Sequence, residues 1–322
     1  MSTSGGIELH RICSRITLSL AAVTGLFLAT GTAAAEPEQL PVNYSVAQWF
    51  IDANTAKPPF DPPGANDWSC VPTAAHPEPV VLVHGVLGNG GGWPAMAPLL
   101  HNNGYCVYSV TYGIYPSQSG PIAGMGGMEP IPQSSNELRD FVNRVLDSTG
   151  ASKVNLLTWS EGTLVGAHYL LFNGGDQVVS KTFNLVPIWA GTHVADPVVN
   201  AAAGLGVDQA VFDALRPICQ GCVDMLPVSD FIKNLQAAGV YAPGVQYTNL
   251  VTRADTEVVP YTSGVREAPN ATNIVLQDVC PVNFAGHNSV SVDPTVAALM
   301  LNTFSPGSVA EIPCAPSPSP YI

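Results

Sequence analysis

The pentapeptide Thr158-Trp159-Ser160-Glu161-Gly162 joins a short apolar run to an apolar helix pattern. Residues 154–157 precede it and are typical of a buried parallel strand. Residues 164–172 follow it with the spacing of a largely buried helix. A serine between such a strand and helix lies on a sharp turn, with its hydroxyl exposed and the helix N-terminus pointing at it. We interpret Ser160 as a candidate nucleophile; an ordinary helix N-cap is the alternative.

Strands and helices alternate along the rest of the chain. We expect strands at 79–83, 105–112, 154–157, 183–189, 245–251 and 272–276, and helices at 93–100, 134–148, 164–172 and 294–304. Residues 113–132 are rich in glycine and proline and predict a loop, and residues 192–243 look like an inserted cap. The alternation predicts a parallel sheet covered by helices on both faces.

The first 35 residues are typical of a secretory signal. Arg11 and Arg15 supply the positive flank, residues 16–29 the apolar stretch, and Ala33-Ala34-Ala35 the cleavage site. A membrane anchor is the alternative, but the apolar run is short for a span. We therefore expect a secreted protein, cleaved near Ala35. Its domains are a Pro-rich arm at 36–79 and one α/β domain at 80–322, with the cap at about 192–243.

Composition narrows the possible partners. Of 322 residues, 46% are hydrophobic and 11% charged, so the chain can bury a large core. The formal net charge of −13 disfavours nucleic acids and anionic membranes as partners. We expect a monomer that binds a small-molecule or lipid ester, with transient contact to a lipid interface.

An even number of cysteines in an exported chain indicates disulfides. Beyond the leader these are Cys70, Cys106, Cys219, Cys222, Cys280 and Cys314. Fifteen connectivities exist, and we favour pairing neighbours in order: Cys70–Cys106, Cys219–Cys222 and Cys280–Cys314. A redox or zinc role for Cys219 and Cys222 is the alternative, but it would need a thioredoxin-like setting or a second ligand pair.

A serine nucleophile needs a histidine base and a carboxylate that orients this base, both after strand ends. In this architecture the carboxylate precedes the histidine in the chain. Asp255 follows the expected strand 245–251, and His287 follows the strand 272–276. These two residues complete the predicted triad. Glu257 is a rival carboxylate and His193 a rival base.

The loop after the first strand carries a glycine-rich stretch, residues 85–92. Such a loop donates one backbone N–H to an oxyanion hole, and the residue after the nucleophile donates another. We assign these N–H groups to Val86 and Glu161. The charge of Glu161 would oppose an oxyanion unless its side chain points away or is paired. Candidate substrate contacts are Ile122, Met125, Met128 and Trp159.

These motifs together resemble the secreted class 2 bacterial lipases over roughly residues 68–304. The resemblance is carried by residues 81–85, Trp93, 158–162, 173–175, 190–193, 219–222, 229–231, 247–255, 260–261, 277–281, 286–287 and 293–294. It implies an α/β-hydrolase fold with a mostly parallel sheet and an inserted cap. The family usually has Gly-His-Ser-Gln-Gly at the serine, and the Thr-Trp-Ser turn here is similar to that of some fungal B-type lipases.

The resemblance implies an ester hydrolase of lipase or esterase type that acts through an acyl-enzyme formed on Ser160, with Asp255 and His287 as partners. It implies no metal and no organic cofactor. Two other hypotheses stay open at this point. One is an acyltransferase of the cell envelope, which differs only in its acceptor. The other is a non-catalytic binding protein that kept the fold, for which Glu161 is the best support.

Overall fold

The computed structural model describes residues 39–55 and 57–317. The expected secretory signal at 1–35 lies outside these residues. The strands are β1 (Val80–Val83), β2 (Val107–Val110), β3 (Val154–Trp159), β4 (Val179–Leu185), β5 (Gln246–Val251) and β6 (Ala271–Val275). The helices are α1 (Val46–Thr55), α2 (Met96–Asn102), α3 (Ile131–Thr149), α4 (Glu161–Phe172), α5 (Asp196–Gly204), α6 (Asp208–Leu215), α7 (Gln220–Asp224), α8 (Asp230–Ala238), α9 (Leu276–Val279) and α10 (Pro294–Phe304).

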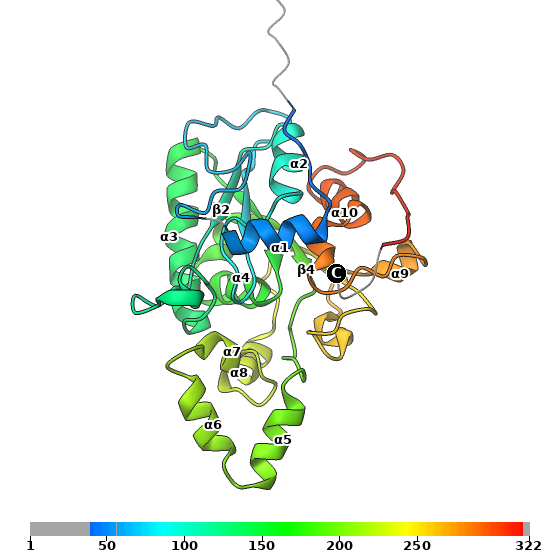
Figure 1. Cartoon of the computed structure of the whole chain (residues 1–322). Coiled ribbons are helices and arrows are strands. Elements are labelled where there is room, and N and C mark those ends of the chain that lie inside the picture. Colours follow the sequence, from blue (N-terminus) through cyan, green and yellow to red (C-terminus); the bar gives the residue numbers. More distant parts are fainter. Residues whose placement is uncertain (1–38, 56, 318–322) are drawn as a thin grey trace, which may run out of the picture. The chain divides into compact units, whose positions relative to one another are not determined.

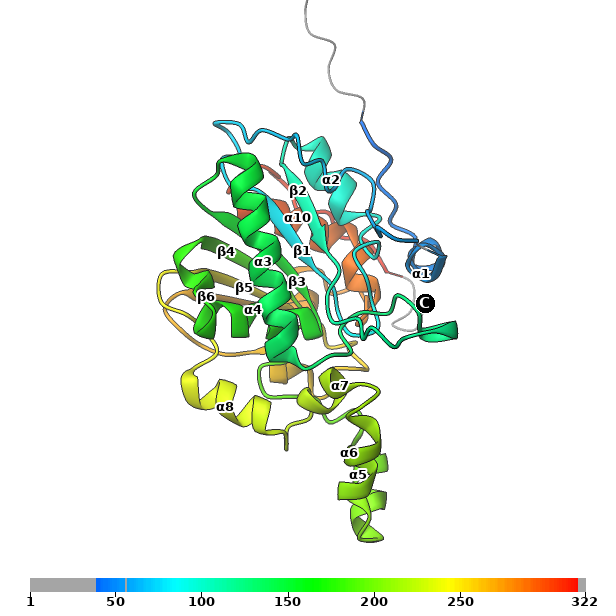
Figure 2. The same cartoon turned by 90° about the vertical axis from the view of Figure 1, so that its left-hand side faces the viewer.

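The strands form one parallel sheet in the order β2-β1-β3-β4-β5-β6. Helices α3 and α4 cover one face, and α2 and α10 cover the other (Figures 1 and 2). Strand β1 shows why both faces are apolar: Val81 and Val83 pack toward α3 and α4, while Val80 and Leu82 pack toward α2 and α10. A strand buried on both sides reads as a continuous apolar run, as observed. The architecture confirms the predicted α/β-hydrolase fold.

Two differences from expectation bear on the site, while other elements differ by a few residues at their ends. Strand β4 covers Val179–Leu185 rather than 183–189, and it stops there because Val186 has a positive φ of 44° and Pro187 offers no N–H for a ladder. The arm at 36–79 contains helix α1, which was not expected. The indole of Trp49 in α1 donates to the carbonyl of Gly92 (3.0 Å) and packs edge-on against Trp159 (5.7 Å between ring centroids).

A row of polar side chains crosses the sheet between β3 and β6. Thr158, Asn184, Asn249 and Asn273 stand opposite one another in register. The hydroxyl of Thr158 donates to the Asn184 amide oxygen (2.7 Å), and the Asn184 and Asn249 amides each donate to the next oxygen in the row (2.9 Å). The first three residues are buried, so these hydrogen bonds satisfy polar groups that water does not reach. We call this set the amide row.

The expected cap contains α5 to α8, which lie between β4 and β5 in the chain. Helices α5 and α6 form a hairpin that points away from the sheet, whereas α7 and α8 lie closer to it (Figures 1 and 2). The cysteines form the three favoured pairs, Cys70–Cys106, Cys219–Cys222 and Cys280–Cys314. Across the described ranges, every helix is too short or too polar to cross a bilayer.

Candidate active site

Ser160 lies at the turn from β3 to α4, at the carboxyl end of the sheet. Its backbone has φ 55° and ψ −125°, a conformation that is strained for a residue with a Cβ. In the described helix α4, Ser160 makes no capping hydrogen bond with its side chain, so the N-cap interpretation does not explain it. Such strain persists only where the surrounding structure holds it, and it directs the hydroxyl outward from the turn.

The imidazole of His287 meets this hydroxyl. Its Nε2 lies 2.8 Å from Ser160 Oγ, and its Nδ1 lies 3.1 Å from both carboxylate oxygens of Asp255. The side chains of His287 and Asp255 are 3% and 1% exposed, so solvent hardly weakens this pairing. The structure therefore brings together the three residues predicted from chain order, within hydrogen-bonding distance.

Asp255 also orders its own loop. Its Oδ1 accepts the backbone N–H groups of Glu257 (2.9 Å) and Val258 (2.8 Å). These bonds fix the carboxylate independently of the histidine. The rival base His193 lies elsewhere, with its Nδ1 2.8 Å from Asp196 and its side chain half exposed.

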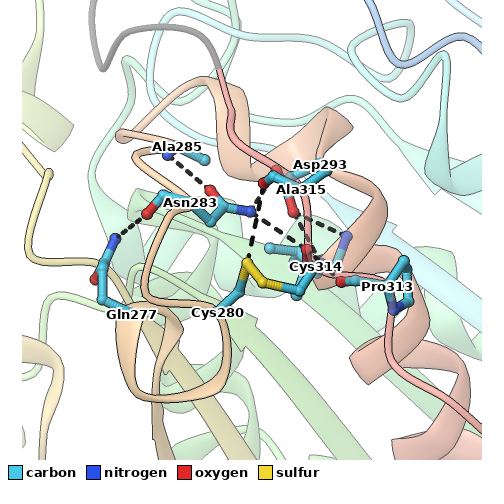
Figure 3. The surroundings of a disulfide bond; sticks show 10 residues. Gln277, Cys280, Asn283, Ala285, Asp293, Pro313, Cys314 and Ala315 are labelled. Carbon is cyan, nitrogen blue, oxygen red and sulfur yellow. Dashed lines mark hydrogen bonds between the residues drawn. A yellow bond between two sulfur atoms is a disulfide. The ribbon is translucent and has the colours of Figure 1, made fainter.

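The loop that carries His287 is braced from several sides (Figure 3). The amide of Asn283 donates to Asp293 (2.9 Å), and its amide oxygen accepts the N–H of Ala285 (2.9 Å). The side chain of Gln277 donates to the Asn283 carbonyl (3.0 Å), and the disulfide Cys280–Cys314 ties the same segment to the C-terminal tail. The histidine is thus positioned by the predicted disulfide Cys280–Cys314 together with Asn283, a residue that sequence reasoning did not single out.

Trp159 supports the histidine from the serine side. Its indole nitrogen donates to the His287 carbonyl (3.1 Å), and its ring is buried. Met128 is buried too, and its sulfur accepts from the Gln118 amide. Burial favours packing roles for both over contact with a substrate. Ile122 is exposed and Met125 half-buried, so their role as substrate contacts stays a prediction.

The pKa of His287 reflects competing effects. Burial alone would lower this pKa, but the hydrogen bond and charge of Asp255, with the charge of Glu257, raise it above its ordinary value. The buried ring of His84 behaves differently, because burial lowers its pKa to about 4 and keeps it neutral. His84 stacks on Tyr112 instead of entering the triad.

The glycine-rich loop lies against the serine. A Cβ placed on Gly85 would stand 3.0 Å from Ser160 Cβ, so a side chain there would crowd the hydroxyl. Two backbone hydrogen bonds connect this loop to Gly126. Leu87 N–H donates to the Gly126 carbonyl (2.8 Å), and Gly126 N–H donates to the Gly88 carbonyl (2.6 Å). Gly85 and Ser160 are in contact, and Val86 and Glu161 are the residues that directly follow them in the chain. Their role as oxyanion donors stays a prediction.

The side chain of Glu161 is fully buried and enclosed by segments distant in the chain. Tyr112 donates its hydroxyl to Glu161 Oε2 (3.3 Å), and Gly127 and Gly221 lie so close that a Cβ on either would collide with the carboxyl group. Burial raises the pKa of Glu161 well above its ordinary value; the Tyr112 hydrogen bond opposes this shift, and the charge of Asp224 adds to it. Burial thus disfavours a negative charge on Glu161 beside an oxyanion.

The raised pKa makes Glu161 a source of pH-dependent instability. A carboxyl group with a folded-state pKa above its unfolded value of about 4.3 stabilises the fold least at high pH. Glu161→Gln is therefore expected to increase the free energy of unfolding by about 1–3 kcal/mol at pH 7. The gain should shrink as the pH falls toward 4. Urea unfolding of both proteins across pH 4–8 measures it.

The exposed Glu311 offers a matched control. Glu311→Gln should give nearly the same free energy of unfolding as the parent protein at each pH in this range. A Glu161→Gln protein that is less stable than the parent at pH 7 would show that the carboxyl is charged and paired in the fold.

Comparisons with known proteins agree with this architecture. The sequence model of one family, described as lipase (class 2), matches residues 77–300. No curated protein matches the chain. Among solved structures, lipase B of Aspergillus fumigatus is similar with a TM-score of 0.55 and 17% identity, over 77% of this chain and 62% of the fungal chain. The propeptide form of lipase BlEst2 of Bacillus licheniformis is similar with a TM-score of 0.50 and 15% identity, over 80% and 55%. The chain thus spans less than two thirds of either neighbour, and these likenesses concern the fold.

Proposed function

The chain belongs to the class 2 lipase family, and we propose that it is a secreted serine hydrolase that cleaves carboxylic esters, lipid esters among them, through an acyl-enzyme. The observation that carries the proposal is the series of hydrogen bonds from Asp255 through His287 to Ser160. Three disulfides suit an oxidising compartment and support secretion. The Thr-Trp-Ser turn is the feature shared with fungal B-type lipases.

The proposed mechanism assigns one role to each of these residues. His287 Nε2 takes the proton of Ser160 while the serine oxygen attacks the ester carbonyl, and the N–H groups of Val86 and Glu161 stabilise the oxyanion. The imidazolium then gives its proton to the departing alcohol, which leaves an acyl group on Ser160. Water activated by the same histidine releases the acid. Asp255 keeps the imidazole proton on Nδ1 and stabilises the imidazolium.

A short-chain chromogenic ester and an aryl organophosphonate test the proposal together. We expect hydrolysis of the ester, inhibition by the phosphonate, and a phosphonyl adduct on the peptide that contains Ser160. The binding-protein hypothesis predicts neither reaction. Its main support is a charge at Glu161, and burial, which disfavours the charged form of this carboxyl, weakens that support.

The cap hairpin, α5 with α6, favours lipid substrates. Among the described side chains of these helices, Ala202 alone is buried. Val198 in α5 is 64% exposed, and Leu205, directly after α5, is 79% exposed. Such apolar exposure on a projecting hairpin is typical of a surface that contacts an apolar phase. Three aspartates and one arginine accompany it, namely Asp196, Asp208, Asp213 and Arg216. An acidic hairpin suits an uncharged lipid surface rather than an anionic one.

Replacing both Val198 and Leu205 by aspartate is expected to lower the rate on an emulsified long-chain ester by about tenfold relative to the rate on a dissolved ester. The two charges would have to enter the apolar phase in place of two aliphatic side chains. Val71→Asp, in the arm and 78% exposed, is the matched control and should leave this ratio unchanged. Equal losses on both substrates would contradict contact between the hairpin and lipid.

A further inference from the structure

A second carboxylate lies beside the imidazole of His287. Glu257 Oε2 is 3.7 Å from Nε2, the nitrogen that also meets Ser160 Oγ at 2.8 Å. Asp255 contacts the other nitrogen, Nδ1. The two carboxylates therefore face different sides of one ring, and Glu257 is on the side where the reaction takes place.

Hydrogen bonds hold both the backbone and the carboxylate of Glu257 in this position. Its backbone N–H donates to Asp255 Oδ1 (2.9 Å), and its Oε1 accepts the side-chain amide of Asn288 (2.9 Å). With Oε1 anchored, Oε2 is directed at the imidazole. The side chain remains 49% exposed, so a bound ligand can reach it, unlike the buried Asp255.

The neighbouring basic side chains contact other carboxylates. Arg253 contacts Asp278 (2.7 Å), and the ring of His193 contacts Asp196 (2.8 Å). The charge of Glu257 is thus shared with the neutral amide of Asn288 and with His287.

In serine ester hydrolysis, Nε2 gives its proton to the alcohol oxygen that leaves. That oxygen must lie within hydrogen-bonding distance of Nε2, so a carboxylate 3.7 Å from the same atom is close to the alcohol portion of the ester. Resting on the function proposed above, we propose that Glu257 is a specificity-determining residue that selects esters by the charge of their alcohol portion. It favours cationic over anionic alcohols.

Three aryl butyrates with the same acyl group test this selection: the 3-trimethylammoniophenyl, 3-nitrophenyl and 3-carboxyphenyl esters. The measured quantity is the ratio of kcat/KM for the cationic and the anionic ester, corrected for their rates with hydroxide. One unit charge at about 5 Å in a water-like medium alters binding by about fourfold. Since the two esters respond in opposite directions, Glu257→Gln is expected to reduce the ratio by about tenfold. High salt should reduce it in the parent protein as well.

Glu267→Gln is the matched control. Glu267 is exposed and also accepts an asparagine amide, from Asn273 (3.1 Å), but it precedes β6 at the amino end of the sheet. This variant should keep the parent ratio. An unchanged ratio in Glu257→Gln would overturn the inference. A loss common to all three esters would also overturn it, since that result assigns Glu257 to holding the loop.

A second readout separates charge from loop structure. Because Glu257 adds to the forces that raise the pKa of His287, Glu257→Gln should shift the acid limb of the pH profile of kcat/KM to lower pH. Glu267→Gln leaves Glu257 and its anchor Asn288 intact and should leave this limb in place. If no butyrate is hydrolysed, or if hydrolysis survives Ser160→Ala, the proposed function fails. If hydrolysis depends on Ser160 but ignores alcohol charge, the selection by Glu257 alone fails.

Discussion

Ser160→Ala is expected to lower kcat for ester hydrolysis by about 10⁶-fold, the largest effect of any single substitution in this chain. The variant keeps the turn but has no oxygen to attack the carbonyl. His287→Ala should cost about as much, and the double variant little more, because the residues act as one unit. Initial rates on a chromogenic butyrate, at equal concentrations of folded protein determined by absorbance, measure these losses.

Ser229→Ala is the control for a merely structural serine. Ser229 caps α8 through its hydroxyl, which accepts the N–H of Ile232 (3.1 Å). Losing this cap should cost about 1 kcal/mol of stability without changing kcat. If Ser160→Ala behaved like Ser229→Ala, Ser160 would be a structural residue of the turn.

The second large effect is expected for Asp255→Asn, at about 10⁴-fold in kcat. The asparagine oxygen would keep the backbone N–H groups of Glu257 and Val258, which now donate to Oδ1. The amide NH₂ would then face His287 Nδ1, 3.1 Å away in the parent, and donate to it. The ring proton would move to Nε2, which could no longer accept the serine proton.

Rates of Asp255→Asn and Glu257→Gln on the neutral nitrophenyl ester, measured side by side, decide between the two carboxylates. Glu257 touches Nε2 from the solvent side and does not set the tautomer. Its substitution should therefore cost at least about 10²-fold less than that of Asp255. Equal losses would mean that Asp255 is not the residue that orients the base.

The fold was predictable because short stretches of the sequence indicate its strands and helices. Apolar runs such as residues 80–83 can be buried on both faces only in a parallel sheet. The end of β4 was missed because buried loop residues such as Ile188 and Trp189 are as apolar as strand residues, although Pro187 in the sequence argues against a longer strand. Helix α1 did leave a signal: Ser45 accepts the N–H of Gln48, and Val46, Trp49 and Phe50 follow at helical spacing.

The candidate site divides in the same way. Chain order and strand ends were enough to select Ser160, Asp255 and His287, because parallel strands bring their carboxyl ends to one edge. The direction of the Glu161 side chain was not accessible, since it depends on two glycines contributed by remote segments. The second carboxylate at Glu257 was visible only as a rival to Asp255, because its distance from Nε2 depends on how two loops meet.

The amide row has a consequence for how damage spreads through the protein. Asn184 and Asn249 each also donate outside the row, to the Thr182 hydroxyl (3.0 Å) and to the Tyr241 hydroxyl, so removing the edge residue Asn273 takes away one of two acceptors of Asn249. Thr158 and Asn184 keep their acceptors, because their hydrogen bonds donate toward Asn184 and Asn249. A substitution at the edge strand β6 is therefore expected to be contained at Asn249, two strands away from Thr158 and the serine turn.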